Sequence, residues 1–491
     1  MPDPRHVVIM GAGPAGLTAA YELDKHDLRV TVLEKDPLYV GGIARTVEHH
    51  GYRFDIGGHR FFSKSQEIED LWTEILGEEM LTRDRLSRIY YRGKFFDYPL
   101  RAANALINLG LAETALCMAS YAQARVRPIR PARTVEDWVT NQFGRRLFEM
   151  FFKTYTEKVW GISTSELSAD WAAQRIKGLD LQQAIKSALL PKRTDERGAV
   201  IKTLIDKFRY PRLGPGQMWE RVRDVLVQHG QDVRLGAEVE AIRHAGGRVS
   251  AVEAGDRRVA GDEFISTLPI QDLVGRLRPA APAPVRHAAG SLRYRDFVTV
   301  ALVIDRAEIF PDNWVYIHDP TVRVGRLQNF KNWSPGMVAD PGKTCIGLEY
   351  FCFEGDGLWT STDDELIALA TRELAALSMS RPEEVVDGAV VRVQKAYPVY
   401  DDEYLGHVAT VRDWIDRELP NLHLAGRNGM HKYNNQDHSM MTALVVARNI
   451  AAGAGLDPWK VNTDAEYHEE ARSDGDTSGR TVPTRVRGAT P

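Results

Sequence analysis

Three glycines near the start of the chain carry the clearest chemical signal. Gly11, Gly13 and Gly16 follow the apolar run His6–Met10 at G-x-G-x-x-G spacing, and an alanine-rich segment comes next. Between a strand and a helix, such glycines permit a tight turn, close approach of the backbone to a pyrophosphate, and close helix packing. A second apolar run ends at Glu34, where a carboxylate can bind ribose hydroxyls. The pattern predicts a dinucleotide-binding site.

Two further glycine pairs follow. Gly41 and Gly42 are adjacent, and Gly57 and Gly58 precede His59 at the end of a strand-like run. Adjacent glycines allow the backbone to approach a ligand closely. This order of a fingerprint, a glycine pair, and a strand opening into a second pair resembles the large FAD-dependent family that includes amine oxidases, protoporphyrinogen oxidases and UDP-galactopyranose mutases. The resemblance implies FAD rather than NAD, extended along this part of the chain.

The same resemblance implies which residues contact the FAD. His59 matches a histidine on a mobile turn beside flavin N5, and Val239 matches a residue that meets the adenine through its backbone. The segment Asn435–Ser439 opens a helix, whose N-terminus can stabilise negative charge on a reduced flavin. The implied FAD-binding residues are Gly11, Gly13, Pro14, Ala15, Gly16, Glu34, Lys35, Gly41, Gly42, Arg45, Gly57, Gly58, His59, Val239, Gly426, Asn435, Gln436 and Ser439.

Later segments narrow the resemblance to the UDP-galactopyranose mutases, over about residues 5–452. Those enzymes hold a nucleotide sugar against reduced flavin, whose N5 forms a covalent adduct with the anomeric carbon before the sugar recloses in the other ring size. The resemblance therefore implies a pyranose/furanose mutase, an isomerase with no net redox change. The segments that carry it are Phe95–Leu100, Thr154–Gly161, Asp170–Arg175, Arg326–Pro335 and Asn435–Ser439.

Two arginines match the diphosphate-binding arginines of that family. They are Arg175 and Arg326, and a guanidinium suits phosphate because its planar fork donates two hydrogen bonds at once. With His59, they are the expected catalytic residues. The expected substrate-binding residues are Tyr155, Arg175, Tyr316, Arg326, Trp333, Tyr397 and Tyr433.

Some positions depart from the mutase pattern. Trp333 stands where the eukaryotic enzymes have a phosphate-binding tyrosine, and Arg101 stands where a glutamine near the uracil is usual. The spacing from Tyr433 to the Asn-Gln pair is also shorter. These changes leave flavin binding untouched but leave the sugar and the base open. Asp437-His438 suggests a catalytic dyad, but no G-x-S-x-G nucleophile motif precedes it, so a hydrolase is not expected.

Composition bears on the other functional classes. A net charge of −4 with dispersed basic residues gives no nucleic-acid-binding arm. Cys117, Cys345 and Cys352 are scattered and no metal-ligand spacing is present, so we expect neither disulfides nor a metal. No apolar run reaches the roughly 18 residues of a membrane span, and no signal peptide precedes the first strand, which favours the cytoplasm. The apolar stretch Ala102–Tyr121 leaves a membrane-surface helix as an alternative.

The expected fold is α/β: a Rossmann-like FAD-binding domain, an inserted helical cap, and a substrate domain with a mixed or antiparallel sheet. Periodicity predicts helices at Ser65–Leu76, Ala102–Ala124, Thr134–Phe143, Arg145–Val159 and from Gly214 to about His229, with 65–185 helical throughout. Leu190–Arg212 is expected to be a connector. The expected divisions are 1–64, 190–289 and 421–463 for the FAD domain, 65–189 for the cap, 290–420 for the substrate domain, and 464–491 for a disordered tail.

Alternation predicts the strands of the two sheets. In the FAD domain they are His6–Met10, Leu28–Leu33, Asp232–His244, Arg248–Ala254, Glu263–Leu268 and Asn421–Gly426. In the substrate domain they are Phe297–Ile304, Trp314–His318, Arg326–Phe330, Cys345–Phe353 and Val390–Tyr397.

Two rival functions remain open at this point. The first is a true FAD oxidoreductase, such as an amine, polyene or porphyrinogen oxidase or a desaturase, which would share the fold. The second is a membrane-surface or scaffold flavoprotein. For the mutase, we expect a nucleotide-sugar substrate, a reductant such as NAD(P)H and a possible homo-oligomer, with no nucleic-acid partner.

Overall fold

A parallel sheet of five strands organises the FAD-binding part of the molecule. The computed structural model describes residues 5–98, 100, 102–167, 169, 207–401 and 403–462. The strand order is β20-β13-β1-β2-β9, and every neighbouring pair is parallel. Three segments far apart in sequence thus meet in one sheet. The strands are β1 (His6–Met10), β2 (Arg29–Leu33), β9 (Asp232–Arg234), β13 (Glu263–Ser266) and β20 (Leu422–Leu424).

Helices cover both faces of this sheet, which explains why its strands are apolar on both sides. Four helices share one hydrophobic core with Val7, Ile9 and Ile265 of the sheet: α1 (Pro14–Asp24), α2 (Gln66–Leu76), α10 (Gly216–Gln228) and α17 (Gln436–Ala452). On the other face, Val8, Met10 and Phe264 pack in a second core with α11 (Ile270–Arg276), α12 (Ala283–Ser291) and α15 (Tyr404–Glu418). That core includes a small sheet of β10 (Val239–Ala245), β11 (Arg248–Ala254), β12 (Arg257–Ala260) and β14 (Leu277–Arg278).

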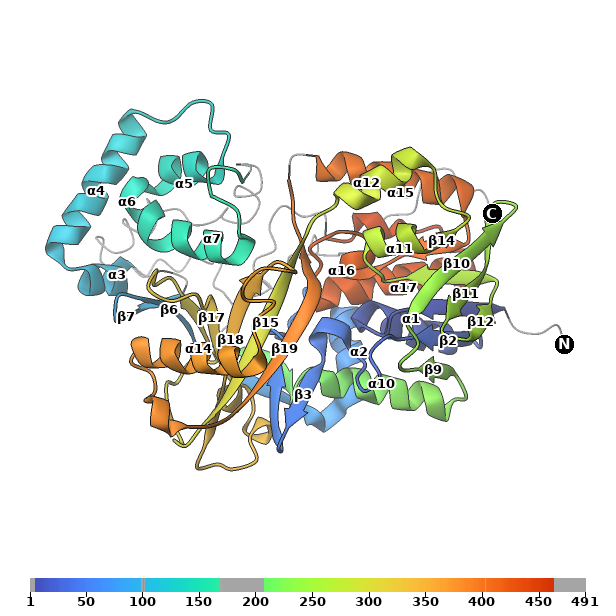
Figure 1. Cartoon of the computed structure of the whole chain (residues 1–491), viewed down its shortest axis with the longest axis horizontal. Helices are drawn as coiled ribbons and strands as arrows, with labels where there is room; N and C mark the ends of the chain where they lie inside the picture. The colour runs from blue at the N-terminus through green and yellow to red at the C-terminus, as the bar shows by residue number, and fades with distance from the viewer. Residues whose placement is uncertain are drawn as a thin grey trace, which may run out of the picture.

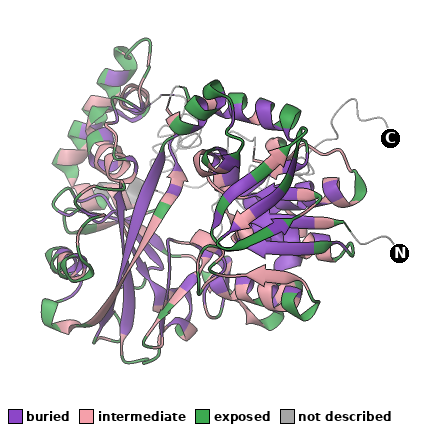
Figure 2. Cartoon of the chain, turned by 45° about the vertical axis from the view of Figure 1, so that its right-hand side comes forward, coloured by how far each residue is buried: buried purple, intermediate pink, exposed green. Residues whose placement is uncertain are grey.

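A second large sheet lies beside the first (Figure 1). Its order is β19-β15-β18-β17-β16-β6-β7, and it is antiparallel except for the parallel pair β16–β6. Figure 2 shows that its long central strands are buried. Helix α14 (Asp363–Ala376) covers one face. The strands are β6 (Ser87–Tyr91), β7 (Lys94–Asp97), β15 (Tyr294–Ile304), β16 (Trp314–Ile317), β17 (Arg326–Asn329), β18 (Thr344–Cys352) and β19 (Val385–Pro398).

The inserted region is helical only in part. The predicted helix Ala102–Ala124 is two helices, separated by Gly110 at φ +81°. Residues 80–97, expected to be helical, form strands instead, because the alternating side chains of Ile89 and Tyr91 face a core and Arg92-Gly93 makes a tight turn. The helices are α2 (Gln66–Leu76), α3 (Ala102–Leu109), α4 (Leu111–Val126), α5 (Val135–Phe143), α6 (Arg145–Phe148) and α7 (Thr154–Trp160), with a π-helical turn at Glu149–Lys153.

Two short antiparallel strand pairs complete the fold. Strand β3 (Thr46–His49) pairs with β4 (Tyr52–Asp55), and β5 (Met80–Asp84) pairs with β8 (Lys207–Pro211). The connector expected at Leu190–Arg212 therefore ends in a strand, and its earlier part lies outside the described residues, as does the tail from 464. Within the described ranges, no helix has both the length and the apolarity needed to cross a membrane.

Candidate functional site

A cavity of about 510 Å³ lies at the carboxyl ends of the parallel strands. Gly11 follows β1, Glu34 follows β2, Thr267 follows β13 and Gly426 follows β20, and all four line it. Residues 392–396 of β19 line it from the second sheet. Open α/β sheets bind ligands in this crevice, because loops from several strands converge there. The cavity therefore lies where the glycine fingerprint predicts a dinucleotide.

The glycines of the fingerprint are fixed by close backbone contacts. Gly11 has φ +103°, and a Cβ there would lie 2.2 Å from Thr267 Oγ1. A Cβ on Gly16 would lie 1.9 Å from the carbonyl oxygen of Gly11, so the first turn of α1 rests directly on the loop before it. Gly13 and Gly42 lie against each other in the wall of the cavity, and a Cβ on Gly42 would lie 3.3 Å from Gly13 Cα. The two glycine segments thus form one cradle of bare backbone.

Glu34 sits where a ribose-binding carboxylate is expected. Its side chain accepts hydrogen bonds from the backbone N–H of Ala12 at 2.8 Å and of Asp36 at 2.9 Å. These bonds fix the carboxylate at the end of β2, and each oxygen keeps a further lone pair for a ligand hydroxyl. Pro14, Ala15 and Lys35 line the same cavity beside it, and so does Val239.

The cavity also holds buried polar atoms without protein partners. Both amide atoms of Gln436 and the Nε of Arg45 are buried with no protein hydrogen bond, and both residues line the cavity. Buried polar groups are nearly always satisfied in native proteins, so these atoms indicate a bound ligand with polar edges. Gln436 is the first residue of α17, with Asn435 as its N-cap, and Ser439 lines the cavity one turn later. This donor set fits the flavin end of FAD.

His59 also lines the cavity, on the turn after β4. Its Nε2 donates to the carbonyl oxygen of Ile56 at 3.0 Å. Removal from bulk water lowers the pKa of His59 to about 4, and the nearby cation of Arg427 acts in the same direction. The imidazole is therefore neutral at pH 7. Gly57 has φ +87°, and Trp314 packs so closely on Gly58 that a Cβ there would lie 1.4 Å from its ring.

Arg326 stands in the second sheet with a buried counter-charge. Its Nε lies 2.7 Å from Glu349 Oε2, and Glu349 is fully buried. Loss of solvent raises the pKa of Glu349, whereas the carboxylate raises that of Arg326 well above its ordinary value. The guanidinium lies over the rings of Trp314 at 5.0 Å and Phe351 at 4.6 Å. The sheet therefore holds this cation in one orientation.

The predicted tyrosines surround Arg326. Tyr316 is its direct cross-strand partner in β16, and Tyr397 Oη accepts a hydrogen bond from Arg326 Nη2 at 3.3 Å. Tyr433 stacks on Tyr397 with centroids 5.7 Å apart. Tyr155 of α7 packs edge-on against Tyr316 at 5.6 Å. Four tyrosines from four separate segments of the chain thus gather around one arginine.

Among the described residues, one predicted substrate residue, Trp333, is not part of this cluster. Trp333 is fully buried in the core with Phe208 and Tyr210, and its Nε1 donates to the carbonyl oxygen of Asn313 at 2.8 Å. The structure thus corrects the expectation for Trp333, since its side chain presents no surface to a substrate. Arg175 lies outside the described residues.

Arg427 and Glu349 belong to the site but were not expected from the sequence. Arg427 lines the cavity, and its guanidinium lies over the rings of Tyr397 at 5.3 Å and Tyr433 at 5.2 Å. It links the flavin cavity to the tyrosine cluster. Its signal in the sequence is its place directly after Gly426, at the end of a strand of the parallel sheet.

Comparisons with known proteins agree with this geometry. The sequence is 26% identical to a phytoene dehydrogenase of Streptomyces griseus over 309 residues, covering 58% of this chain and 59% of that protein. It is 25% identical to a probable UDP-galactopyranose mutase of Klebsiella pneumoniae over 175 residues, covering 34% of this chain and 43% of that protein. The matches thus span less than two thirds of these relatives.

The fold is similar to a crystal structure of reduced UDP-galactopyranose mutase, with a TM-score of 0.78, 21% identity, and coverage of 92% of this chain and 94% of that one. The family described as flavin containing amine oxidoreductase matches residues 14–450. Gly16, Gly42, the Glu34 carboxylate and the unpartnered amide of Gln436 lie within that match, and Gly11 and Gly13 come directly before it. The chain belongs to the flavin-containing amine oxidoreductase family and is an FAD-dependent enzyme.

Proposed function

We propose that the protein is a nucleotide-sugar pyranose/furanose mutase that works with reduced FAD. The observation that carries this proposal is the Arg326 guanidinium, which is held by Glu349 and two aromatic rings within a cluster of tyrosine hydroxyls. A planar guanidinium beside phenolic O–H donors suits a diphosphate. The similarity to UDP-galactopyranose mutases in sequence and fold supports the same function.

In this proposal, Arg326 and Arg427 neutralise the diphosphate as it leaves the sugar and as it returns. Glu349 keeps the Arg326 guanidinium in place, so the arginine side chain loses little conformational entropy when substrate binds. Tyr397 and Tyr433 present their rings toward Arg427, and their hydroxyls can donate to phosphate oxygens. When bound, reduced FAD would supply the nucleophile that the reaction needs at the anomeric carbon.

His59 has a separate role in this proposal. Because its pKa lies near 4, the imidazole is neutral at working pH and adds no positive charge beside the flavin. With Nε2–H donating to the carbonyl oxygen of Ile56, its Nδ1 can accept a hydrogen bond there without competing with the arginines for the diphosphate. The aromatic rings around the site exclude water, which would otherwise intercept a reactive sugar.

The test uses the purified flavoprotein, reduced by dithionite without oxygen. UDP and UDP-sugars are titrated while the flavin spectrum is followed, and sugar ring size is analysed in the products. We expect Arg326→Lys, which keeps the charge but loses the planar fork, to weaken UDP binding by about 10- to 100-fold. Arg175→Ala is expected to weaken it as well. The matched control is Arg88→Lys, which changes the Arg88–Asp312 pair at the other side of the sheet.

Ring-size exchange without consumption of an electron acceptor would support the mutase. No response to any nucleoside diphosphate, or equal UDP binding by Arg326→Lys and the wild type, would overturn it. The second candidate is an FAD-dependent dehydrogenase, favoured by the 26% identity to the phytoene dehydrogenase. That function predicts substrate-dependent reduction of the flavin and stoichiometric use of an electron acceptor.

A further inference from the structure

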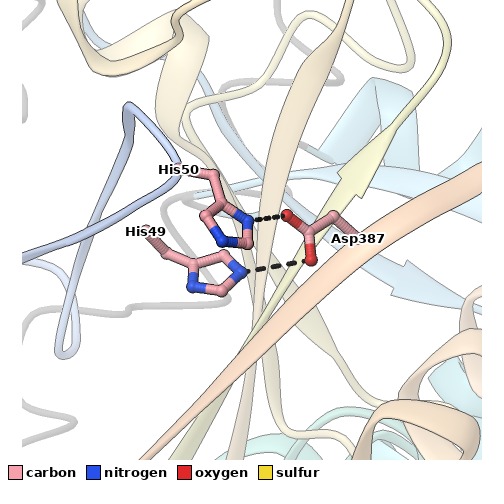
Figure 3. A group of neighbouring side chains, drawn as sticks. All are labelled: His49, His50 and Asp387. Atoms are coloured by element: carbon pink, nitrogen blue, oxygen red, sulfur yellow. Dashed lines mark hydrogen bonds and ion pairs between the residues drawn. The ribbon is translucent and has the colours of Figure 1, made fainter.

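We propose that His49, His50 and Asp387 form a binding site for a divalent transition-metal ion of the Zn²⁺ class, which fastens the β3–β4 hairpin to strand β19. Figure 3 shows the two imidazoles directed at one carboxylate. His49 Nε2 lies 3.1 Å from Asp387 Oδ1, and His50 Nδ1 lies 2.7 Å from Asp387 Oδ2. None of the three residues lines the flavin cavity, and the site plays no part in the proposed function.

The hairpin turn explains how two consecutive residues come to face the same way. In a strand, successive side chains point to opposite faces. Here His49 pairs with Tyr52, so His50 and Gly51 form a two-residue turn, with φ +49° and +81°. Positive φ at both positions is typical of a type I′ turn, whose first position usually holds Asn, Asp or Gly. The turn swings the His50 ring beside that of His49, with centroids 4.0 Å apart.

The carboxylate comes from a different part of the fold. Asp387 lies in β19, at the opposite end from Tyr397, and its Oδ1 also accepts the backbone N–H of Gly388 at 2.8 Å. In the described part of the chain, its side-chain partners are the two imidazoles, with no Lys or Arg among them. The cluster therefore joins two segments that are more than 300 residues apart in sequence. No spacing motif could have revealed it, which is why the sequence predicted no metal.

The donor set fits a borderline metal ion. Two imidazole nitrogens and one carboxylate oxygen are ligands that Zn²⁺, Ni²⁺ and Cu²⁺ accept readily, whereas Mg²⁺ and Ca²⁺ prefer oxygen. The ligand atoms all lie within 4.8 Å of one another. Tetrahedral bonds of about 2.1 Å place ligands about 3.4 Å apart, so small side-chain rotations suffice. His50 is 73% exposed, which leaves the remaining coordination position open to water.

Binding replaces hydrogen bonds with coordinate bonds. Each neutral imidazole carries one proton, which moves to the nitrogen that faces away from Asp387, and the freed lone pair binds the metal. Other histidine–carboxylate pairs in the described structure contain a single imidazole, such as His229 with Asp24. Among the described residues, this is the one group of three His, Cys, Asp or Glu side chains whose ligand atoms all lie within 4.8 Å of one another.

The experiment is isothermal titration of tag-free, FAD-loaded protein with ZnCl₂, with MgCl₂ as the comparison ion. We expect one Zn²⁺ per chain, a higher melting temperature with Zn²⁺, and no response to Mg²⁺. Asp387→Asn and His50→Asn should each weaken Zn²⁺ binding on the order of 100-fold. Asparagine suits the left-handed backbone at position 50, so that variant keeps the turn. His229→Asn is the matched control and should bind Zn²⁺ like the wild type.

The flavin spectrum and the melting temperature without metal confirm that each variant is folded. Equal Zn²⁺ affinity in the wild type, Asp387→Asn and His50→Asn would overturn the proposal, because binding would then lie elsewhere. Absence of Zn²⁺ binding by the wild type would overturn it as well. Native mass spectrometry gives the stoichiometry independently of heat.

Discussion

At the scale of single residues, the ion pair between Arg326 and Glu349 affects both the stability of the sheet and the proposed binding of a diphosphate. Their charges compensate each other inside the sheet, and Glu349 also accepts a hydrogen bond from Gln328 Nε2 at 2.6 Å. A buried ion pair often contributes little net stability, but removal of one partner leaves an uncompensated charge. A diphosphate bound to Arg326 would supply a second anion at the same place.

We therefore expect Glu349→Gln to lower stability by about 3–5 kcal/mol, since the Arg326 cation loses its partner. Bound UDP should restore part of this loss, so the UDP-induced rise in melting temperature should be larger in Glu349→Gln than in the wild type. Differential scanning fluorimetry with and without UDP measures both effects.

The control variant is Asp312→Asn, because Asp312 is also a fully buried carboxylate paired with an arginine, Arg88. It should lose stability without gaining sensitivity to UDP. If UDP stabilises Asp312→Asn and Glu349→Gln to the same extent, Arg326 does not bind the diphosphate.

At the scale of elements, the contact between α1 and the loop before it governs FAD binding. Gly16→Ala would place a Cβ 1.9 Å from the carbonyl oxygen of Gly11, so the helix must move off the strand. We expect this variant to lose most of its bound FAD, measured as the ratio of flavin to protein absorbance after purification. The control is Gly290→Ala in α12, where a Cβ would meet nothing within 4 Å. Similar FAD loss in both variants would contradict the role given to α1.

The same elements show how far the sequence alone could lead. The glycine fingerprint between two apolar runs predicted β1, α1 and β2 because its steric demands are local, and Thr134–Phe143 was predicted almost to the residue by its apolar spacing. The strands at 80–97 were missed because their apolar residues also fit a helical spacing, although Arg92-Gly93 is a hairpin signal. Only the pairing of β6 with β16, more than 200 residues away, decides between the two.

The residues of the candidate site also fall into those that the sequence alone could predict and those that it could not. Arg326, Tyr316 and Tyr397 could be predicted because each lies in a segment with its own sequence pattern. Glu349 could not, because it faces Arg326 through the register of β17 with β18. Trp333 was assigned to the substrate by its position in a motif, but its burial depends on packing with Phe208 from a distant strand.

At the scale of the whole molecule, the site lies where the end of β19 in the second sheet meets the FAD-binding part. We call this contact region the seam. Strand β19 runs along the second sheet and ends at the FAD domain, where Asn428 Nδ2 donates to the carbonyl oxygen of Lys395 at 2.9 Å. Lys395 also pairs with Asp272 of α11. The flavin and the proposed diphosphate site are thus held together by contacts between the sheets, rather than by either sheet alone.

Arg427 is the side chain that spans this seam most directly. Its Nη1 donates to the carbonyl oxygen of Ala396 at 3.2 Å and its Nε to that of Asn434 at 2.9 Å. We expect Arg427→Met to leave both carbonyl oxygens without this donor, to lower stability by about 2–4 kcal/mol, and to weaken UDP binding while FAD is retained. Thermal unfolding and UDP titration of the reduced protein measure the two effects.

Arg412→Met is the matched control for Arg427→Met. Arg412 also lies over an aromatic ring, that of Trp459 at 4.8 Å. Its carboxylate partners are Asp416 of the same helix and Asp457, and neither belongs to the second sheet, so Arg412 does not cross the seam. Loss of a cation over a ring costs about 0.5–1 kcal/mol at an exposed site. If contacts across the seam organise the site, Arg427→Met must lose more stability and more UDP affinity than Arg412→Met. Equal behaviour of the two variants would mean that the sheets are joined without Arg427 and that its place beside Tyr397 and Tyr433 is incidental to binding.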